Sequence, residues 1–154
     1  MSQDYTGAGI IIFSRKISEN EEIKYLTLRV GKKIDLPKGG IDMLDNGQKE
    51  EPLFAAIRET KEECSLSNVI DYKLIKDFEC ESGERLIMFL AESTATLEDP
   101  YRNVEIVENK KTGIKEHDDA NWLTLKEIFS GEFGNLYSYL NKPLLIAENY
   151  IINM

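Results

Sequence analysis

Cysteine and histidine are scarce in this chain of 154 residues, and it has no long hydrophobic run. The two cysteines, Cys64 and Cys80, are too few for a disulfide framework and lack metal-ligand spacing. We therefore expect both to be small buried hydrophobic residues in a reducing compartment. No apolar run approaches the ~20 residues that a membrane span requires, and the N-terminal segment shows no signal peptide. These absences predict a cytoplasmic protein.

Basic residues are also in deficit, with 19 lysines and arginines against 28 aspartates and glutamates. The resulting net charge of −9 disfavours long nucleic acid as the main ligand, because phosphate backbones are bound by clustered Lys and Arg. It is compatible with a small phosphorylated ligand held by a few residues and a cation. The length and the hydrophobic fraction of 42% predict a single globular domain over residues 1–154. They do not specify an oligomeric state.

Segments rich in β-branched and aromatic residues predict a sheet with turns between its strands. The predicted strands are 7–15, 24–30, 67–81, 84–93 and, more weakly, 104–108. A short extended segment, 33–42, is broken by Pro37 and by the pair Gly39-Gly40. It leads into a polar loop, 43–50, in which Asn46-Gly47 is typical of a turn.

A helical pattern covers residues 51–64. Pro52 suits the first helical turn, where its missing N–H is not needed, and apolar residues then recur at helical spacing. Residues 120–130 begin as a strand and continue as a helix. Residues 136–153 are amphipathic and helical, with Pro143 starting, kinking or interrupting that helix. Strands with helices between and after them predict a mixed α/β domain.

The helix at 51–64 carries three glutamates at helical spacing, Glu59, Glu62 and Glu63. Residues three and four positions apart share a helix face, so these like charges repel by a few tenths of a kcal/mol per pair. One interpretation is a solvated acidic face neutralised by Arg58 and Lys61. The other is a metal site, because clustered carboxylates with a backbone carbonyl favour Mg²⁺ or Mn²⁺ over softer metals.

The segment just before the polar loop supports the metal site. It contains a cation, Lys38, followed by the flexible pair Gly39-Gly40, where a turning backbone can present its carbonyls and amides beside the carboxylates. Since Mg²⁺ keeps several waters and commonly bridges to substrate phosphates, such a site would recruit a phosphorylated ligand. Lys38 would then hold a phosphate as a point charge.

The region from Gly39 to Leu66 resembles the Nudix box, whose pattern is G-x5-E-x7-R-E-U-x-E-E-x-G-U, with U aliphatic. Glu50 precedes Arg58-Glu59 at the family's spacing, and the R-E-x-x-E-E core is complete. Three departures are visible: the loop between glycine and Glu50 is about five residues longer, Thr60 replaces an aliphatic residue, and Ser65 replaces the glycine that usually ends the helix. None of these departures removes a metal ligand.

The resemblance implies a Nudix-type α/β/α sandwich with a mixed sheet. It implies that Glu59, Glu62 and Glu63 bind divalent cations together with the Gly39 carbonyl. Arg58 would orient these carboxylates. Glu50 would pair with Arg58 as a structural residue. The activity implied is hydrolysis of a compound in which a nucleoside diphosphate is linked to another group, with Mg²⁺ as the cofactor and Mn²⁺ as a substitute.

Three further segments resemble the asymmetric diadenosine tetraphosphate hydrolases: residues 7–13 and 86–93 resemble two of their strands, and the third has their Glu-His followed after a short gap by Trp-Leu. Residues 115–128 contain this sequence, and the resemblance implies that Glu116 reaches the metal site. A solvated acidic run competes evenly with that role. His117 is expected to be structural or surface-exposed rather than the general base. Trp122 and the strand aromatics are possible base platforms, but core packing is the more common role of such residues.

The resemblance implies a Mg²⁺-dependent hydrolase that cleaves diadenosine tetraphosphate asymmetrically to ATP and AMP. Either Glu59 or Glu116 would act as the base. The alternative within the family is a pyrophosphatase for ADP-ribose, diphosphoinositol phosphates or capped RNA. An alternative from another class is a module that senses a nucleotide without cleaving it, although such modules usually lack some of the glutamates that are present here.

Overall fold

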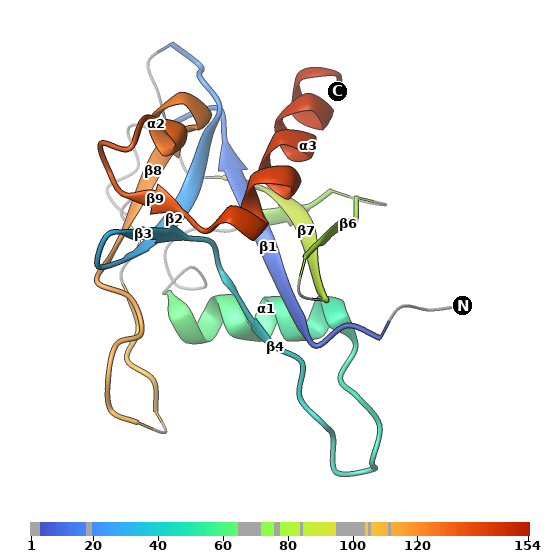
Figure 1. Cartoon of the computed structure of the whole chain (residues 1–154). Coiled ribbons are helices and arrows are strands. Elements are labelled where there is room, and N and C mark those ends of the chain that lie inside the picture. Colours follow the sequence, from blue (N-terminus) through green and yellow to red (C-terminus); the bar gives the residue numbers. More distant parts are fainter. Residues whose placement is uncertain are drawn as a thin grey trace.

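The computed structural model describes residues 4–17, 20–64, 72–75, 78–83, 85–94, 104, 106–110 and 112–154. Within these residues, nine strands form one sheet with helices on both of its faces (Figure 1). The strands are β1 (Gly7–Ser14), β2 (Lys24–Val30), β3 (Lys33–Asp35), β4 (Lys38–Gly40), β5 (Tyr72–Leu74), β6 (Cys80–Ser82), β7 (Leu86–Ser93), β8 (Asp119–Thr124) and β9 (Asn135–Leu136). The helices are α1 (Pro52–Glu63), α2 (Leu125–Ser130), the 3₁₀ turn η1 (Ser138–Leu140) and α3 (Asn141–Ile152).

The sheet contains both parallel and antiparallel strand pairs. Its main path runs β5-β7-β1-β2-β3-β9, while β4, β6 and β8 pair with β1, β7 and β2, respectively. The pairs β1–β7 and β3–β9 are parallel, and the other pairs are antiparallel. Since β4 pairs with β1, the Lys-Gly-Gly segment is fixed to the centre of the sheet. This arrangement sets the backbone against which α1 packs.

The central strand β1 is buried on both faces. Ile10 and Ile12 belong to the apolar cluster on the α1 side of the sheet, and Ile11 and Phe13 belong to the cluster on the α3 side. All four side chains are fully buried, as expected when successive residues of a strand point to opposite faces. Burial of each such side chain contributes about 1.5–3 kcal/mol to folding. The predicted α/β/α sandwich with a mixed sheet is therefore confirmed.

The structure confirms the predicted helix at 51–64 almost to the residue, because α1 runs from Pro52 to Glu63. Residues 120–130 change from strand to helix as predicted. Thr124 makes the change abrupt: its side chain accepts from the Glu127 N–H, and the Glu127 side chain accepts from the Thr124 N–H. This reciprocal pair is a capping box, which starts a helix by satisfying free N–H groups.

The prediction of one strand over 67–81 is wrong for the residues that the structure describes. Two separate strands, β5 and β6, both pair with β7. Leu74 lies opposite Ala91, whereas Cys80 lies opposite Met88, so the register changes between the two strands. Alternation of residue types cannot reveal such a change, because it depends on the partner strand. Residues 67–71 and 76–77 of this prediction lie outside the described residues.

Two other segments differ from the simplest expectation. In the predicted strand 104–108, the described residues form isolated bridges, from Ile106 to Cys64 and from Glu108 to Lys115. Pro143 lies in the first turn of α3, where no intrahelical N–H bond is lost. The helix begins two residues earlier, at Asn141, so Pro143 belongs to the start of the helix and neither kinks nor interrupts it. Among the helices described, none combines the length and the apolarity needed to cross a membrane.

The predicted polar loop is a protruding hairpin between β4 and α1 (Figure 1). Met43 pairs with Lys49, and Gly47 adopts a positive φ of 83° at its tip, a conformation that glycine accommodates without steric cost. At its base, the Glu50 N–H donates to the Asp42 carbonyl at 2.8 Å. The extra residues of this loop therefore form a closed hairpin that holds Glu50 beside α1.

Candidate active site

The three glutamates of α1 lie on one side of the helix but differ in burial. The side chain of Glu63 is 5% exposed, that of Glu59 is 16% exposed, and that of Glu62 is 55% exposed. Helix α1 packs on the sheet through Ala55, Ala56 and Thr60, so its next turn carries Glu63 toward the sheet. The helix face that the three glutamates share therefore extends from the protein interior at Glu63 to the solvent at Glu62.

Arg58 joins the glutamates of this face. Its Nε and Nη2 donate to the two carboxylate oxygens of Glu50 at 3.0 and 2.9 Å, and its Nη1 donates to Glu59 and Glu62, each at 3.1 Å. Its Nη2 also donates to the Gly40 carbonyl at 2.9 Å. This forked contact holds the pKa of Glu50 below its ordinary value. The predicted pairing of Glu50 with Arg58 is confirmed.

We expect the substitution Arg58→Ala to lower the free energy of unfolding by about 2–3 kcal/mol, because it leaves the half-buried Glu50 and Glu59 without their charged donor. Chemical denaturation would measure this loss. Arg15→Ala is the matched control, since Arg15 pairs with Glu92 at a more exposed site and should cost less than about 1 kcal/mol. Equal losses for the two variants would contradict the structural role of Arg58.

Glu59 lies directly against the glycine pair. A Cβ atom at Gly39 would lie 2.0 Å from the Glu59 Cδ and 2.1 Å from its Oε2, so only glycine permits this approach. Burial raises the pKa of Glu59, and the neighbouring charge of Glu62 adds to the shift, with a smaller contribution from Glu116. A carboxylate with a raised pKa beside other carboxylates is suited to accept a proton or to bind a cation.

Glu63 is the most buried carboxylate of the helix. Its Oε1 accepts a hydrogen bond from the Lys38 backbone N–H at 2.8 Å, and its Oε2 lies 3.3 Å from His117 Nδ1. Burial raises the pKa of Glu63 to about 9, because the charged form loses its hydration. An ionised Glu63 would therefore require a nearby positive charge.

Glu116 reaches the same place from the segment that precedes β8. It accepts a hydrogen bond from Asn109 Nδ2 at 2.8 Å. A ligand atom of Glu116, one of Glu63 and one of His117 all lie within 4.8 Å of one another. The structure thus brings Glu116 to the buried end of the acidic face, where the resemblance predicted a metal ligand.

His117 is buried, with 6% of its side chain exposed. Its Nε2 lies 3.1 Å from Asp35 Oδ2 in β3. Its Nδ1 contacts Glu63 but has no partner of hydrogen-bond geometry among the described residues. The sequence did not indicate this position, because Asp35 is remote in the chain.

Lys38 does not point into the acidic face. Its Nζ lies 3.4 Å from Asp35 Oδ1 and 5.4 Å from the ring centroid of Tyr139. The proposed contact between Lys38 and phosphate therefore stays a prediction. The backbone N–H of Lys38 donates to Glu63, whereas its side chain points toward Asp35.

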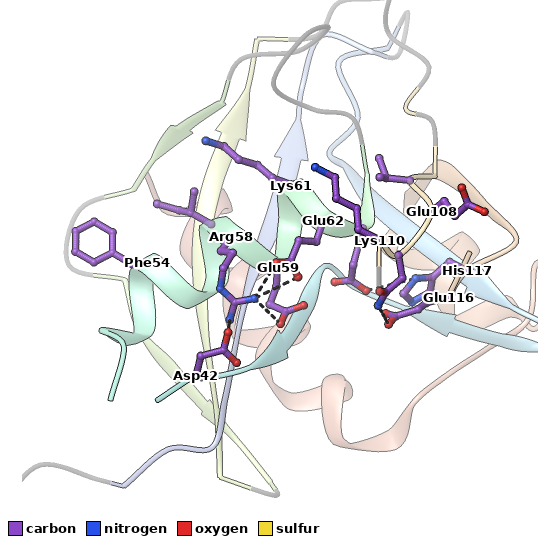
Figure 2. Close-up of a pocket in the computed structure, with 14 residues that line it drawn as sticks. Asp42, Phe54, Arg58, Glu59, Lys61, Glu62, Glu108, Lys110, Glu116 and His117 are labelled. Carbon is purple, nitrogen blue, oxygen red and sulfur yellow. Dashed lines mark hydrogen bonds and ion pairs between the residues drawn. The ribbon is translucent and has the colours of Figure 1, made fainter. Parts of the chain in front are cut away.

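The acidic face opens into a pocket of about 760 Å³ between α1 and residues 107–110 and 116–117. Figure 2 shows Lys61 and Lys110 above the glutamates, with Phe54 farther along the helix. The lining carries six carboxylates, Asp42, Glu59, Glu62, Glu63, Glu108 and Glu116, against three cationic side chains, Arg58, Lys61 and Lys110. Sequence reasoning missed Lys110 and Asn109, since nothing in the pattern of 104–110 indicated a pocket wall.

The residues present fit a divalent cation. Carboxylate oxygens of Glu63 and Glu116 meet a buried imidazole nitrogen that has no hydrogen-bond partner within the described part of the chain, and carboxylates are typical ligands of Mg²⁺ and Mn²⁺. A cation at this place would compensate the charge of the buried Glu63 and reduce repulsion along α1. Glu59, Glu62, Glu63 and Glu116, with the Gly39 carbonyl, remain the predicted ligand set.

Two residues depart from the Nudix pattern at this helix, Thr60 and Ser65, and the structure explains the first of them. Thr60 occupies an aliphatic position, but its hydroxyl donates to the Ala56 carbonyl at 2.8 Å, so the helix satisfies this buried polar group internally. Cys64, which follows the helix, is extended, with φ −149° and ψ 151°. Ser65 lies outside the described residues. Cys64 and Cys80 are both free and buried, as predicted.

No protein-family model and no curated protein sequence matches the chain. Several solved structures match it in fold. An Ap4A hydrolase from C. elegans has a TM-score of 0.64 at 21% identity, with 98% of this chain and 100% of that chain covered. A MutT protein from Methanosarcina mazei has a TM-score of 0.53 at 21% identity, with 97% and 98% covered.

A third solved structure is the NUDIX domain of Shewanella oneidensis NrtR, complexed with ADP ribose. It has a TM-score of 0.54 at 12% identity, with 97% of this chain and 90% of that chain covered. All three likenesses extend over nearly the whole of this chain. Together with the mixed sheet and the position of α1 beside it, they show that the chain has the Nudix fold.

Proposed function

We propose that the chain is a metal-dependent hydrolase of a nucleoside-diphosphate-linked phosphoanhydride. The observation that carries the proposal is the set of carboxylates, Glu59, Glu62, Glu63 and Glu116, gathered at one pocket from α1 and from the segment before β8. Such an acidic pocket repels a polyphosphate unless cations accompany it. When bound, divalent cations would neutralise and polarise the phosphate oxygens.

The chain's own residues would position the reactants and move one proton. A water oxygen forms a bond to one phosphorus, the bridging P–O bond breaks, and Glu59 or Glu116 accepts the proton of the water. Arg58, held by Glu50, keeps Glu59 in place for this step. Lys61 and Lys110 line the pocket and could contact phosphate as point charges. Positioning and charge stabilisation would supply most of the rate enhancement.

The substrate we favour is diadenosine tetraphosphate, cleaved asymmetrically to ATP and AMP. Two observations support it: the Glu-His and Trp-Leu segment that places Glu116 at the pocket, and the likeness in fold to an Ap4A hydrolase. ADP-ribose is the second candidate, since the fold is also shared with a domain complexed with that compound. Diphosphoinositol phosphates and capped RNA follow, and a nucleotide-sensing role without cleavage is the alternative outside catalysis.

A substrate panel tests the proposal. We expect diadenosine tetraphosphate to yield ATP and AMP faster than ADP-ribose, a diphosphoinositol phosphate or capped RNA is cleaved, and only with Mg²⁺ or Mn²⁺ present. Chromatographic separation of the products would measure this, with EDTA-treated protein as the control. Preference for another compound would discard the proposed substrate but keep the chemistry. Metal-dependent nucleotide binding without turnover on any compound would indicate a sensor.

A further inference from the structure

The buried imidazole of His117 lies between two carboxylates that come from different parts of the chain. Its Nε2 is 3.1 Å from Asp35 Oδ2, and its Nδ1 is 3.3 Å from Glu63 Oε2. Asp35 is held in turn, because its Oδ1 accepts from the Leu36 N–H at 2.8 Å and lies 3.4 Å from Lys38 Nζ. The ring is therefore fixed from the Asp35 side.

The contact with Asp35 determines which ring nitrogen of His117 can bind a metal. An ionised carboxylate can only accept hydrogen bonds, so the contact with Asp35 places the proton of a neutral ring on Nε2. The lone pair of Nδ1 then faces the Glu63 carboxylate. Nδ1 has no hydrogen-bond partner among the described residues. A buried Nδ1 lone pair that faces a carboxylate is unfavourable unless a proton or a metal cation lies between the two groups.

A third ligand completes the arrangement. Glu116, held by Asn109, has a carboxylate oxygen within 4.8 Å of the ligand atoms of both Glu63 and His117. Histidines that bind metals commonly donate their second ring N–H to a carboxylate, which orients the ring and raises its basicity. Asp35 stands in that position toward His117.

We propose that His117 Nδ1, Glu63 and Glu116 form a mixed nitrogen and oxygen site for a transition-metal dication. The proposal rests on the proposed function, because the metal would occupy the same pocket, and it refines the expected preference for Mg²⁺. Imidazole suits Zn²⁺, Ni²⁺ and Fe²⁺, whereas Mg²⁺ prefers oxygen ligands. The chain therefore binds these transition metals more tightly than Mg²⁺, and Asp35 acts as a positioning residue for His117.

The test uses the fact that His117 is the only histidine of the chain. Tag-free protein labelled with ¹⁵N-histidine gives one pair of imidazole nitrogen signals. We expect Zn²⁺ to shift the Nδ1 signal strongly and the Nε2 signal weakly, and Mg²⁺ to leave Nδ1 unligated. An unmoved Nδ1 at Zn²⁺ concentrations where calorimetry shows binding would overturn the proposal. So would an imidazolium that persists with Zn²⁺ bound, since a proton would then occupy the place of the metal.

A matched pair of variants tests the positioning role of Asp35. We expect Asp35→Asn to weaken Zn²⁺ and Ni²⁺ binding about 10–100-fold and to change Mg²⁺ binding less, as measured by calorimetry. Asp118→Asn is the control, because Asp118 is adjacent to His117 in sequence but pairs with Arg29. Equal losses in the two variants, or equal losses for Zn²⁺ and Mg²⁺, would contradict the role.

The same samples separate this inference from the proposed function. Mg²⁺-dependent hydrolysis of a panel compound, combined with an Nδ1 signal that does not shift when Zn²⁺ binds, would retain the proposed function. It would overturn the proposal that His117 is a metal ligand. A Zn²⁺-dependent Nδ1 shift without hydrolysis of any panel compound would retain the metal site and overturn the proposed function.

Discussion

The substitution Glu59→Gln should reduce kcat on the preferred panel compound about 10²–10⁴-fold, the range typical for loss of a general base. Glutamine keeps the size of the side chain and can still accept a hydrogen bond from Arg58, but it cannot take a proton from water. Steady-state kinetics with Mg²⁺ would measure the loss. Thermal unfolding would show that the variant is folded.

Glu51→Gln is the matched control for this prediction. Glu51 lies at the N-terminus of the same helix, is exposed, and makes no side-chain capping bond, so kcat should stay unchanged. A Glu59→Gln variant within about threefold of the unmodified protein would show that Glu59 is not the base. Glu116→Gln would then be the variant to measure, since Glu116 is the other carboxylate proposed for this role.

The substitution Gly39→Ala should reduce kcat about 10²-fold while changing stability little. The new Cβ would overlap the carboxyl group of Glu59, and that group ends a side chain that can rotate away. The helix would then remain in place, but Glu59 would leave its contact with Arg58. A displacement of about 1 Å at a catalytic group can cost about 10²-fold in rate. Steady-state kinetics and chemical denaturation together would measure the two effects.

Gly40→Ala is the control for Gly39→Ala, because the nearest atom to a Cβ at Gly40 is the Thr6 carbonyl oxygen at 4.0 Å. This variant should keep both its rate and its stability. If Gly39→Ala loses several kcal/mol of stability, the packing of β4 against α1 is rigid, and the expected movement of Glu59 does not occur. If Gly39→Ala keeps full activity, the close approach of Glu59 to the glycine has no part in catalysis.

Local spacing carried much of the information about the active site. The helix that presents Glu59, Glu62 and Glu63 could be predicted because its period is a local property of the backbone. The ion pair between Arg58 and Glu50 was also expected from the family's motif. The break between β5 and β6 could not be predicted, since register is decided by β7, which follows both strands in the chain.

The sequence by itself determined the acidic helix, the glycine pair that precedes it and the strand character of residues 7–15. These features follow from residue types and spacing within one segment. Only the tertiary structure decided that His117 meets Asp35 and Glu63, and that the Lys38 side chain turns away from the pocket. The physical reason is that sheet pairing places residues from distant segments in contact: β3 carries Asp35 and β8 follows His117, and both pair with β2.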